Sequence, residues 1–235
     1  MKYNEYIFDE PYKYPMGLLK QIYHHLSEKD IKVLLEETYG PKLNLMKRSN
    51  LVYEPELGFN HRPRKGKFVN ISKNGFRSVK NQGPFPINNN YFNIFVFGFS
   101  TTFGVGVKDD ESIPSLLQDH LRDYFKRNDI CVYNFGRCYY KCSQSRILFE
   151  KFISKRIVPN MVIFLHGMGE VMELPYDNYF MEKIFDDNSK NKKLVNSFLD
   201  LLLNRKMQIK QMTLFSDSQN AFETWVANMR MISSI

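Results

Sequence analysis

The sequence predicts an α/β domain in which a parallel β-sheet carries helices on both faces. Short, continuously apolar segments alternate with amphipathic ones between residues 91 and 167 of the 235-residue chain. Apolar strands without polar alternation are typical of a parallel sheet that is buried on both sides. We therefore expect a three-layer α/β/α domain over residues 91–235. The expected strands are 93–98, 130–136 and 161–167, and the expected helices lie near 112–127 and 143–156.

Residues 1–50 are expected to form a small helical appendage. Apolar residues recur on one helical face, and Ser27 offers an N-terminal cap to a second helix that ends near Gly40. We expect both helices within 16–37. The apolar face consists of Leu18, Leu19, Ile22, Tyr23 and Leu26.

Residues 51–90 have a different character, with short extended pieces and turn residues. The dipeptide Asn74-Gly75 between two apolar pieces predicts a β-hairpin. The stretch 82–90 is rich in glycine, proline and asparagine, and is expected to link this hairpin region to the main domain.

The region after the third strand is less regular. Residues 173–212 are expected to be an insertion with a helix near 190–205, followed by an amphipathic helix from Phe222 to Ile232. A further strand should follow that helix, so we expect the sheet to be incomplete at the C-terminus. The open edge of the third strand would then allow association with a strand of another chain.

The distribution of charge and the lengths of the apolar runs argue against a nucleic-acid-binding protein and against a membrane-spanning one. The net charge is +8, but the basic residues are scattered along the chain, which argues against nucleic-acid binding. The densest basic group, expected in a solvated loop, is Arg62, Arg64, Lys65 and Lys67. The apolar runs are too short for a membrane span, and the first residues do not form a secretory signal.

Three cysteines, Cys131, Cys138 and Cys142, form no Cys-x-x-Cys pair. This spacing favours neither a structural zinc site nor a disulfide framework. We expect reduced thiols in a cytoplasmic protein, and no metal or cofactor.

The candidate site lies where the strands end. Each expected strand finishes in a glycine, Gly98, Gly136 or Gly167, and the carboxyl ends of parallel strands share one edge of the sheet. Ser100 follows Gly98 at a strand-to-helix turn, a placement that exposes a nucleophilic hydroxyl in some hydrolases. A serine at such a turn is also common as a cap.

A wider pattern surrounds Ser100. The segment "STTFG" at 100–104 is followed by "KDDESIP" at 108–114, "VYNFG" at 132–136 and "GMGE" at 167–170. Together these blocks resemble the SGNH/GDSL serine esterases. The resemblance implies a flavodoxin-like parallel sheet, Ser100 as nucleophile, and the backbone N–H groups of Ser100 and Gly136 as oxyanion donors. Gly169 stands at the position from which the family provides a further, side-chain donor.

The chain departs from this pattern at three places. Phe99 stands where the family has aspartate or glycine, and Gly169 stands where it has an asparagine. No Asp-x-x-His segment is present, so we expect the chain to lack the part of the domain that carries the catalytic histidine. His166, at the end of the third strand, is a candidate substitute base, and Glu170 is a candidate to orient it or bind a substrate hydroxyl. The remaining histidines, expected on the surface or in packing, are His24, His25, His61 and His120.

Three functions follow as hypotheses. The first is an esterase, impaired in this chain, that acts on an ester or O-acetyl group of a carbohydrate or small molecule. The second is a non-catalytic remnant or binding module that keeps the crevice. The third is a flavodoxin-like flavin or nucleotide protein, which "GFSTTFG" disfavours because it lacks the glycine spacing and lysine of a phosphate loop.

Overall fold

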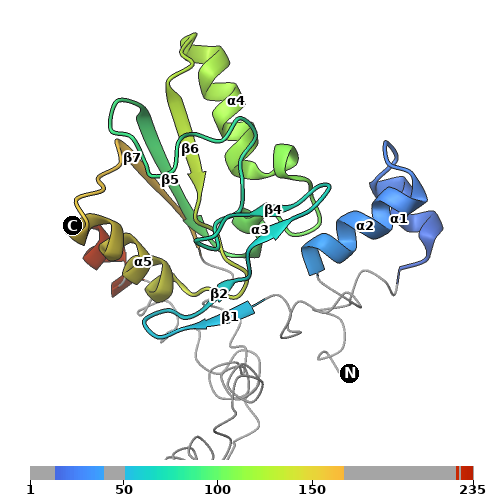
Figure 1. The fold of residues 1–235 in the computed structure, drawn as a ribbon, viewed down its shortest axis with the longest axis horizontal. Helices are drawn as coiled ribbons and strands as arrows, with labels where there is room; N and C mark the ends of the chain where they lie inside the picture. Colours follow the sequence, from blue (N-terminus) through green and yellow to red (C-terminus); the bar gives the residue numbers. More distant parts are fainter. Residues whose placement is uncertain (1–13, 40–50, 167–225, 228, 235) are drawn as a thin grey trace, which may run out of the picture.

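The computed structural model describes residues 14–39, 51–166, 226–227 and 229–234 (Figure 1). The expected 173–212 insertion lies outside the described residues, and 226–227 and 229–233 are helical, as expected. The elements are α1 (Met16–Ile22), α2 (Glu28–Tyr39), β1 (Leu51–Glu54), β2 (Gly58–His61), β3 (Arg64–Lys65), β4 (Asn70–Ile71), β5 (Phe92–Gly98), α3 (Ser100–Phe103), the 3-10 helix η4 (Asp109–Glu111), α4 (Ile113–Phe125), β6 (Ile130–Asn134), α5 (Cys142–Ser154) and β7 (Met161–Leu165).

A parallel sheet of three strands forms the centre of the described structure, in the order β6-β5-β7. Val96 in the middle strand β5 pairs with Asn134 on one side and with Ile163 on the other. The predicted alternation of strands and helices is confirmed, although β6 ends two residues before Gly136. Within the described residues, β7 pairs on one side only.

Successive residues of β5 point to opposite faces of the sheet, and β5 is buried on both faces. Helices therefore cover both sides. Figure 1 shows α4 and α5 on different sides of the sheet. One face packs against α4 through Ile94, Val96, Ile130, Val132, Leu117 and Leu121. The other face packs against α5 through Phe95, Phe97, Tyr133, Phe135, Leu148, Phe149 and Phe152. The described part is therefore a mixed α/β arrangement.

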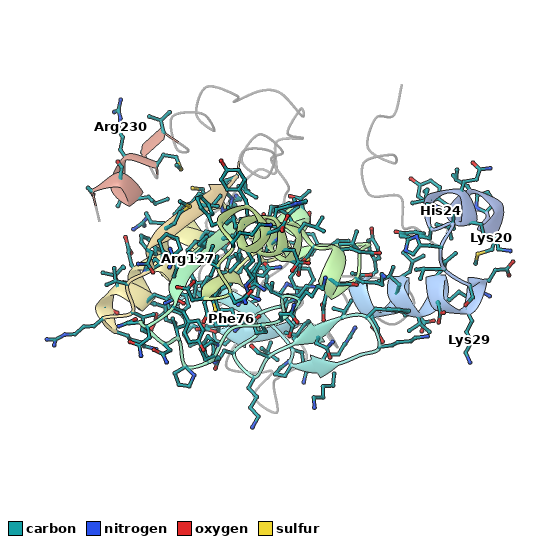
Figure 2. The ribbon with its side chains drawn as sticks, turned by 90° about the horizontal axis from the view of Figure 1, so that it is seen from above. Lys20, His24, Lys29, Phe76, Arg127 and Arg230 are labelled. Atoms are coloured by element: carbon teal, nitrogen blue, oxygen red, sulfur yellow. The ribbon has the colours of Figure 1, made fainter. Side chains whose placement is uncertain are left out.

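Aromatic rings fill the α5 side of the sheet. The rings of Phe135 and Phe152 lie 4.6 Å apart, and Phe135 also meets Phe76 edge-on at 4.6 Å. Figure 2 shows Phe76 inside the molecule, while Lys20 and Lys29 point outward from the N-terminal helices. The hairpin region that contains Phe76 is thus part of the core.

Both predicted N-terminal helices are present, and the Ser27 hydroxyl accepts a hydrogen bond from the Asp30 N–H, as a cap should. They are packed on the main domain. Leu34 of α2 is fully buried against Val69 and Phe103.

Glu37 fastens α2 to the hairpin region. Its carboxylate accepts the backbone N–H groups of Lys67, Phe68 and Val69 at 2.6–2.9 Å. Three of the four basic residues expected in a solvated loop are exposed, whereas Arg64 is partly buried and donates to the Glu37 carbonyl. Lys67, although exposed, pairs with Asp30. These contacts use two of the four basic residues to attach α2.

The predicted hairpin at Asn74-Gly75 is confirmed. Ile71 and Arg77 pair antiparallel across the turn, and the Ser72 N–H donates to the Phe76 carbonyl. Gly75 has a φ of 75°, which a side chain would disfavour. On its other side Arg77 pairs antiparallel with Asn134, so the hairpin joins the sheet at the last residue of β6.

No helix in the described ranges is both long and apolar enough to cross a bilayer.

Replacement of Glu37 with alanine tests the attachment of α2. Three backbone donors would lose a charged acceptor, so we expect unfolding free energy to fall by about 1–3 kcal/mol. Amide hydrogen exchange at 67–69 should accelerate in the same variant. Glu36→Ala, an exposed neighbour on α2, should change neither measurement. Equal behaviour of the two variants would contradict the role of Glu37.

Candidate functional site at the carboxyl end of β5

Ser100 is the first residue of α3, directly after the central strand. Phe99 is extended, with φ −90° and ψ −158°, and the helix ends after one turn at Gly104, which has a left-handed φ of 90°. Ser100 is partly exposed, and its hydroxyl makes no hydrogen bond to another described residue. The turn thus presents this hydroxyl at the carboxyl edge of the sheet.

Glycine is required at the end of β5 because α3 folds back across it. A Cβ atom on Gly98 would lie 2.1 Å from the Thr102 Oγ1 atom and 2.7 Å from the Leu165 carbonyl oxygen. Such contacts are too short for any side chain. The glycine that marked the end of the first strand in the sequence therefore sets how closely α3 approaches β7.

Gly136 lies against the same short helix. A Cβ atom there would be 2.5 Å from the backbone nitrogen of Phe103. The Gly136 N–H donates to the Asn134 Oδ1 atom at 3.0 Å, and the following residue, Arg137, donates its N–H to the Gly98 carbonyl. The predicted residues Ser100 and Gly136 are thus brought to neighbouring loops, and the Gly136 N–H is already engaged.

Asn134 joins these two loops. Its Nδ2 atom donates to the carbonyl of Thr102 at 3.0 Å, while its Oδ1 atom accepts from Gly136. The residue is 1% exposed. Sequence analysis passed over Asn134, although an asparagine that ends an apolar strand is a signal of a buried polar contact.

Arg137 holds the Gly136 peptide from the other side. Its guanidinium donates to the Gly136 carbonyl at 3.0 Å and to the Asn60 Oδ1 atom at 3.1 Å, and it lies 4.5 Å from the Phe76 ring centroid. Burial lowers the pKa of Arg137 to about 10. The N–H and the carbonyl of Gly136 therefore both have hydrogen-bond partners.

Arg77 donates hydrogen bonds to the segment that follows Ser100. Its guanidinium donates to the carbonyls of Phe103, Gly104 and Val107, and its Nε atom donates to Asp109 at 2.9 Å. The free carbonyls at the end of α3 are thereby satisfied, as a helix terminus requires. Arg77 was another residue that sequence analysis missed.

Asp109 provides the buried counter-ion. Besides Arg77 it accepts the backbone and side-chain N–H groups of Asn70 at 2.9 and 2.8 Å. Burial raises the pKa of Asp109 and lowers that of Arg77, while their mutual attraction opposes both shifts. Each charge is therefore stable in the interior only because the other is present.

His61 is buried beside the Ser100 turn. Its ring stacks on Phe103 with centroids 4.3 Å apart, and its Nε2 atom accepts the Cys138 N–H at 3.2 Å. Burial, followed by the nearby charges of Arg137 and Arg77, lowers the pKa of His61 well below its ordinary value. It is a neutral packing residue, one of the two roles expected for it.

His166 lies directly after β7, at the carboxyl edge where it was expected. Its Nε2 atom is 2.9 Å from the Ser145 hydroxyl of α5. Gly169 and Glu170 lie outside the described residues. Of the other histidines, His25 contacts Glu111 and His120 is exposed.

Cys131, Cys138 and Cys142 are free and buried. Burial raises the pKa of Cys138 to about 12, so its thiol stays protonated and is a poor nucleophile. The described ranges contain no group of three or more His, Cys, Asp or Glu residues that could hold a metal ion. Ser100 is therefore the candidate nucleophile of this edge.

Comparison with known proteins gives limited similarity. No protein-family model and no curated protein matches the chain. Among solved structures it is similar to AlinE4, described as an SGNH-hydrolase family esterase, at 14% identity and a TM-score of 0.32, covering 63% of this chain and 98% of that chain. Two mutants of AlinE4 give 14% and 13% identity, TM-scores of 0.32 and 0.31, and the same coverage. A TM-score near 0.3 transfers no residue role to this chain.

Arg77→Met tests whether the buried ion pair supports the Ser100 turn. It would leave the partly buried Asp109 without its cation and would remove a charged donor from three carbonyls, so we expect a loss of about 3–5 kcal/mol of unfolding free energy. Denaturant titration measures this loss. In the control Lys80→Met, which removes the more exposed Lys80–Asp119 pair, the change should stay below about 1 kcal/mol. A small loss for Arg77→Met would contradict the proposed support.

His61 predicts a pH dependence of stability. Because its folded pKa is lowered, the unfolded chain binds more protons below pH about 6.5, and stability is lost as pH falls from there toward the folded pKa. One such proton gives a slope of up to about 1.4 kcal/mol per pH unit. We expect His61→Gln to be less stable at pH 8 but to show a smaller slope between pH 7 and 5. Equal slopes in the two proteins would rule out His61 as the source.

Proposed function

We propose that the chain carries an esterase-like site of the SGNH type, with Ser100 as the nucleophile toward an ester or O-acetyl group of a carbohydrate or small molecule. We also propose the three-layer, flavodoxin-like sheet of that family. The position of Ser100 is the observation that carries the proposal: a partly exposed serine begins a one-turn helix at the carboxyl end of the central parallel strand. Ligands of such sheets bind beyond this edge.

Catalysis by Ser100 would need donors for the developing oxyanion. The proposed donors are the backbone N–H groups of Ser100 and Gly136. Gly169 stands where the family has a donor asparagine, and it has no side chain to serve that role. The Gly136 N–H would have to share its hydrogen with the ester oxygen or leave the Asn134 Oδ1 atom. Loss of a single oxyanion donor costs on the order of 10²–10³ in rate.

A general base is also required, because a neutral serine hydroxyl is a weak nucleophile. The chain contains no Asp-x-x-His segment. His166 is the proposed substitute, and its Nε2 atom lies 2.9 Å from the Ser145 hydroxyl. Removal of the base from a serine triad costs on the order of 10⁶ in rate, so we propose that the activity of this chain is low.

A non-catalytic binding module is the second candidate. The engaged Gly136 N–H favours it, since a donor held by Asn134 stabilises the fold without serving an oxyanion. Phe99 also favours it, because Phe99 stands directly before Ser100, at a position where the SGNH esterases have aspartate or glycine.

Hydrolysis of 4-nitrophenyl acetate tests whether Ser100 acts as a nucleophile in this chain. We expect the unmodified chain to hydrolyse it no faster than Ser100→Ala, because the sequence contains no Asp-x-x-His segment and any residual rate comes from backbone donors that both proteins retain. Initial rates from pH 5 to 9 provide the measurement.

The variants His166→Ala and His120→Ala complete the design, the second being an exposed histidine on α4. Turnover that is lost in both Ser100→Ala and His166→Ala, but kept in His120→Ala, would refute the low-activity proposal and identify His166 as the base. Turnover lost in Ser100→Ala alone would establish the nucleophile and exclude His166.

A further inference from the structure

Two aromatic rings meet beside Ser100. Phe99 immediately precedes it, and Tyr139 belongs to the loop between β6 and α5. Their ring centroids lie 6.4 Å apart with an interplanar angle of 90°. This is an edge-to-face pair, an arrangement that aromatic side chains favour. The two loops that carry Ser100 and Gly136 therefore also meet through their side chains.

The backbone of Tyr139 adopts a conformation that is unusual for its residue type. Its φ is 67°, in the left-handed region, where a bulky residue costs roughly 1–2 kcal/mol more than glycine. The loop is fixed on either side, because Cys138 donates its N–H to His61 and Tyr140 donates its hydroxyl to the Phe59 carbonyl. Residues held in such regions cluster at functional sites.

Exposure distinguishes the pair from its neighbours. Cys138 and Tyr140 are fully buried, whereas Tyr139 between them is only partly buried, and Phe99 is partly exposed as well. Tyr139 also packs against the aromatic core on the α5 side. The Tyr139 ring thus packs against the core and remains partly accessible.

We propose that Phe99 and Tyr139 form a contact surface that selects substrates in which the ester bears an aromatic ring. The inference rests on the proposed function, since the ester group would have to lie at Ser100. An edge-to-face pair can extend to a third ring, which packs its face or edge on the two already present. A small alkyl ester would leave this apolar surface in contact with water.

Binding of 4-fluoroacetophenone tests the surface independently of hydrolysis. This ketone has the aromatic ring and the carbonyl group of a methyl benzoate but no ester bond that could be cleaved. Titration followed by its ¹⁹F signal gives the Kd. We expect Tyr139→Phe to bind as the unmodified chain does, because the ring is retained. Phe99→Ala and Tyr139→Gly should weaken binding about two- to tenfold, the range expected for loss of one aromatic contact. Tyr139→Gly also removes the φ strain, and near-UV circular dichroism checks that each variant is folded.

Phe125→Ala is the matched control, because Phe125 is an exposed aromatic residue at the last position of α4, far from the α3 turn in Figure 1. Its Kd should equal that of the unmodified chain. Cyclohexyl methyl ketone and methyl glucoside, used as competitors, should displace the probe less well than acetophenone. Equal Kd values for all variants, absence of binding, or stronger competition by the glucoside would overturn the proposal. Selective binding, with or without Ser100-dependent ester hydrolysis, would uphold the aromatic surface, because the ketone reports binding alone.

Discussion

The buried Arg77–Asp109 ion pair connects the parts on which the site depends. Arg77 binds three carbonyls of the segment that follows Ser100, and its backbone pairs with Asn134 at the end of β6. Asp109 adds the hairpin strand β4 through Asn70. A buried charge pair is favourable only when its remaining hydrogen bonds are made, and here the surrounding backbone makes them. The position of the Ser100 turn is therefore fixed by the hairpin as well as by the sheet.

The side chains of Asn134, Arg137 and His61 make hydrogen bonds with backbone groups of the loop after β6 that would otherwise be unpaired. Their hydrogen bonds engage the N–H and the carbonyl of Gly136 and the N–H of Cys138. Buried networks of this kind make a single conformation strongly preferred. They also engage the Gly136 N–H, which is one of the donors that the proposed chemistry would need for an oxyanion.

At the carboxyl edge, three of the partly exposed residues lie on the two loops that this network joins. Ser100 offers a hydroxyl, and Phe99 with Tyr139 offers apolar rings. The contrast between the hydrogen-bonded side chains of Asn134, Arg137 and His61 and the apolar rings beside Ser100 underlies both the proposed chemistry and the proposed selectivity. Retention of Tyr139 at a φ of 67° shows that the fold tolerates local strain at this point.

The sequence by itself determined the elements whose signals are local. Apolar runs predicted the three strands, Ser27 the start of α2, Asn74-Gly75 the hairpin, and Gly98 the turn before Ser100. Only the tertiary structure decided which polar residues surround that turn. Arg77 finds the Val107 carbonyl 30 residues away, and His61 meets Cys138 across 77 residues. Periodicity and turn chemistry act over a few residues, whereas burial of a charge or a neutral imidazole depends on partners that folding alone brings together.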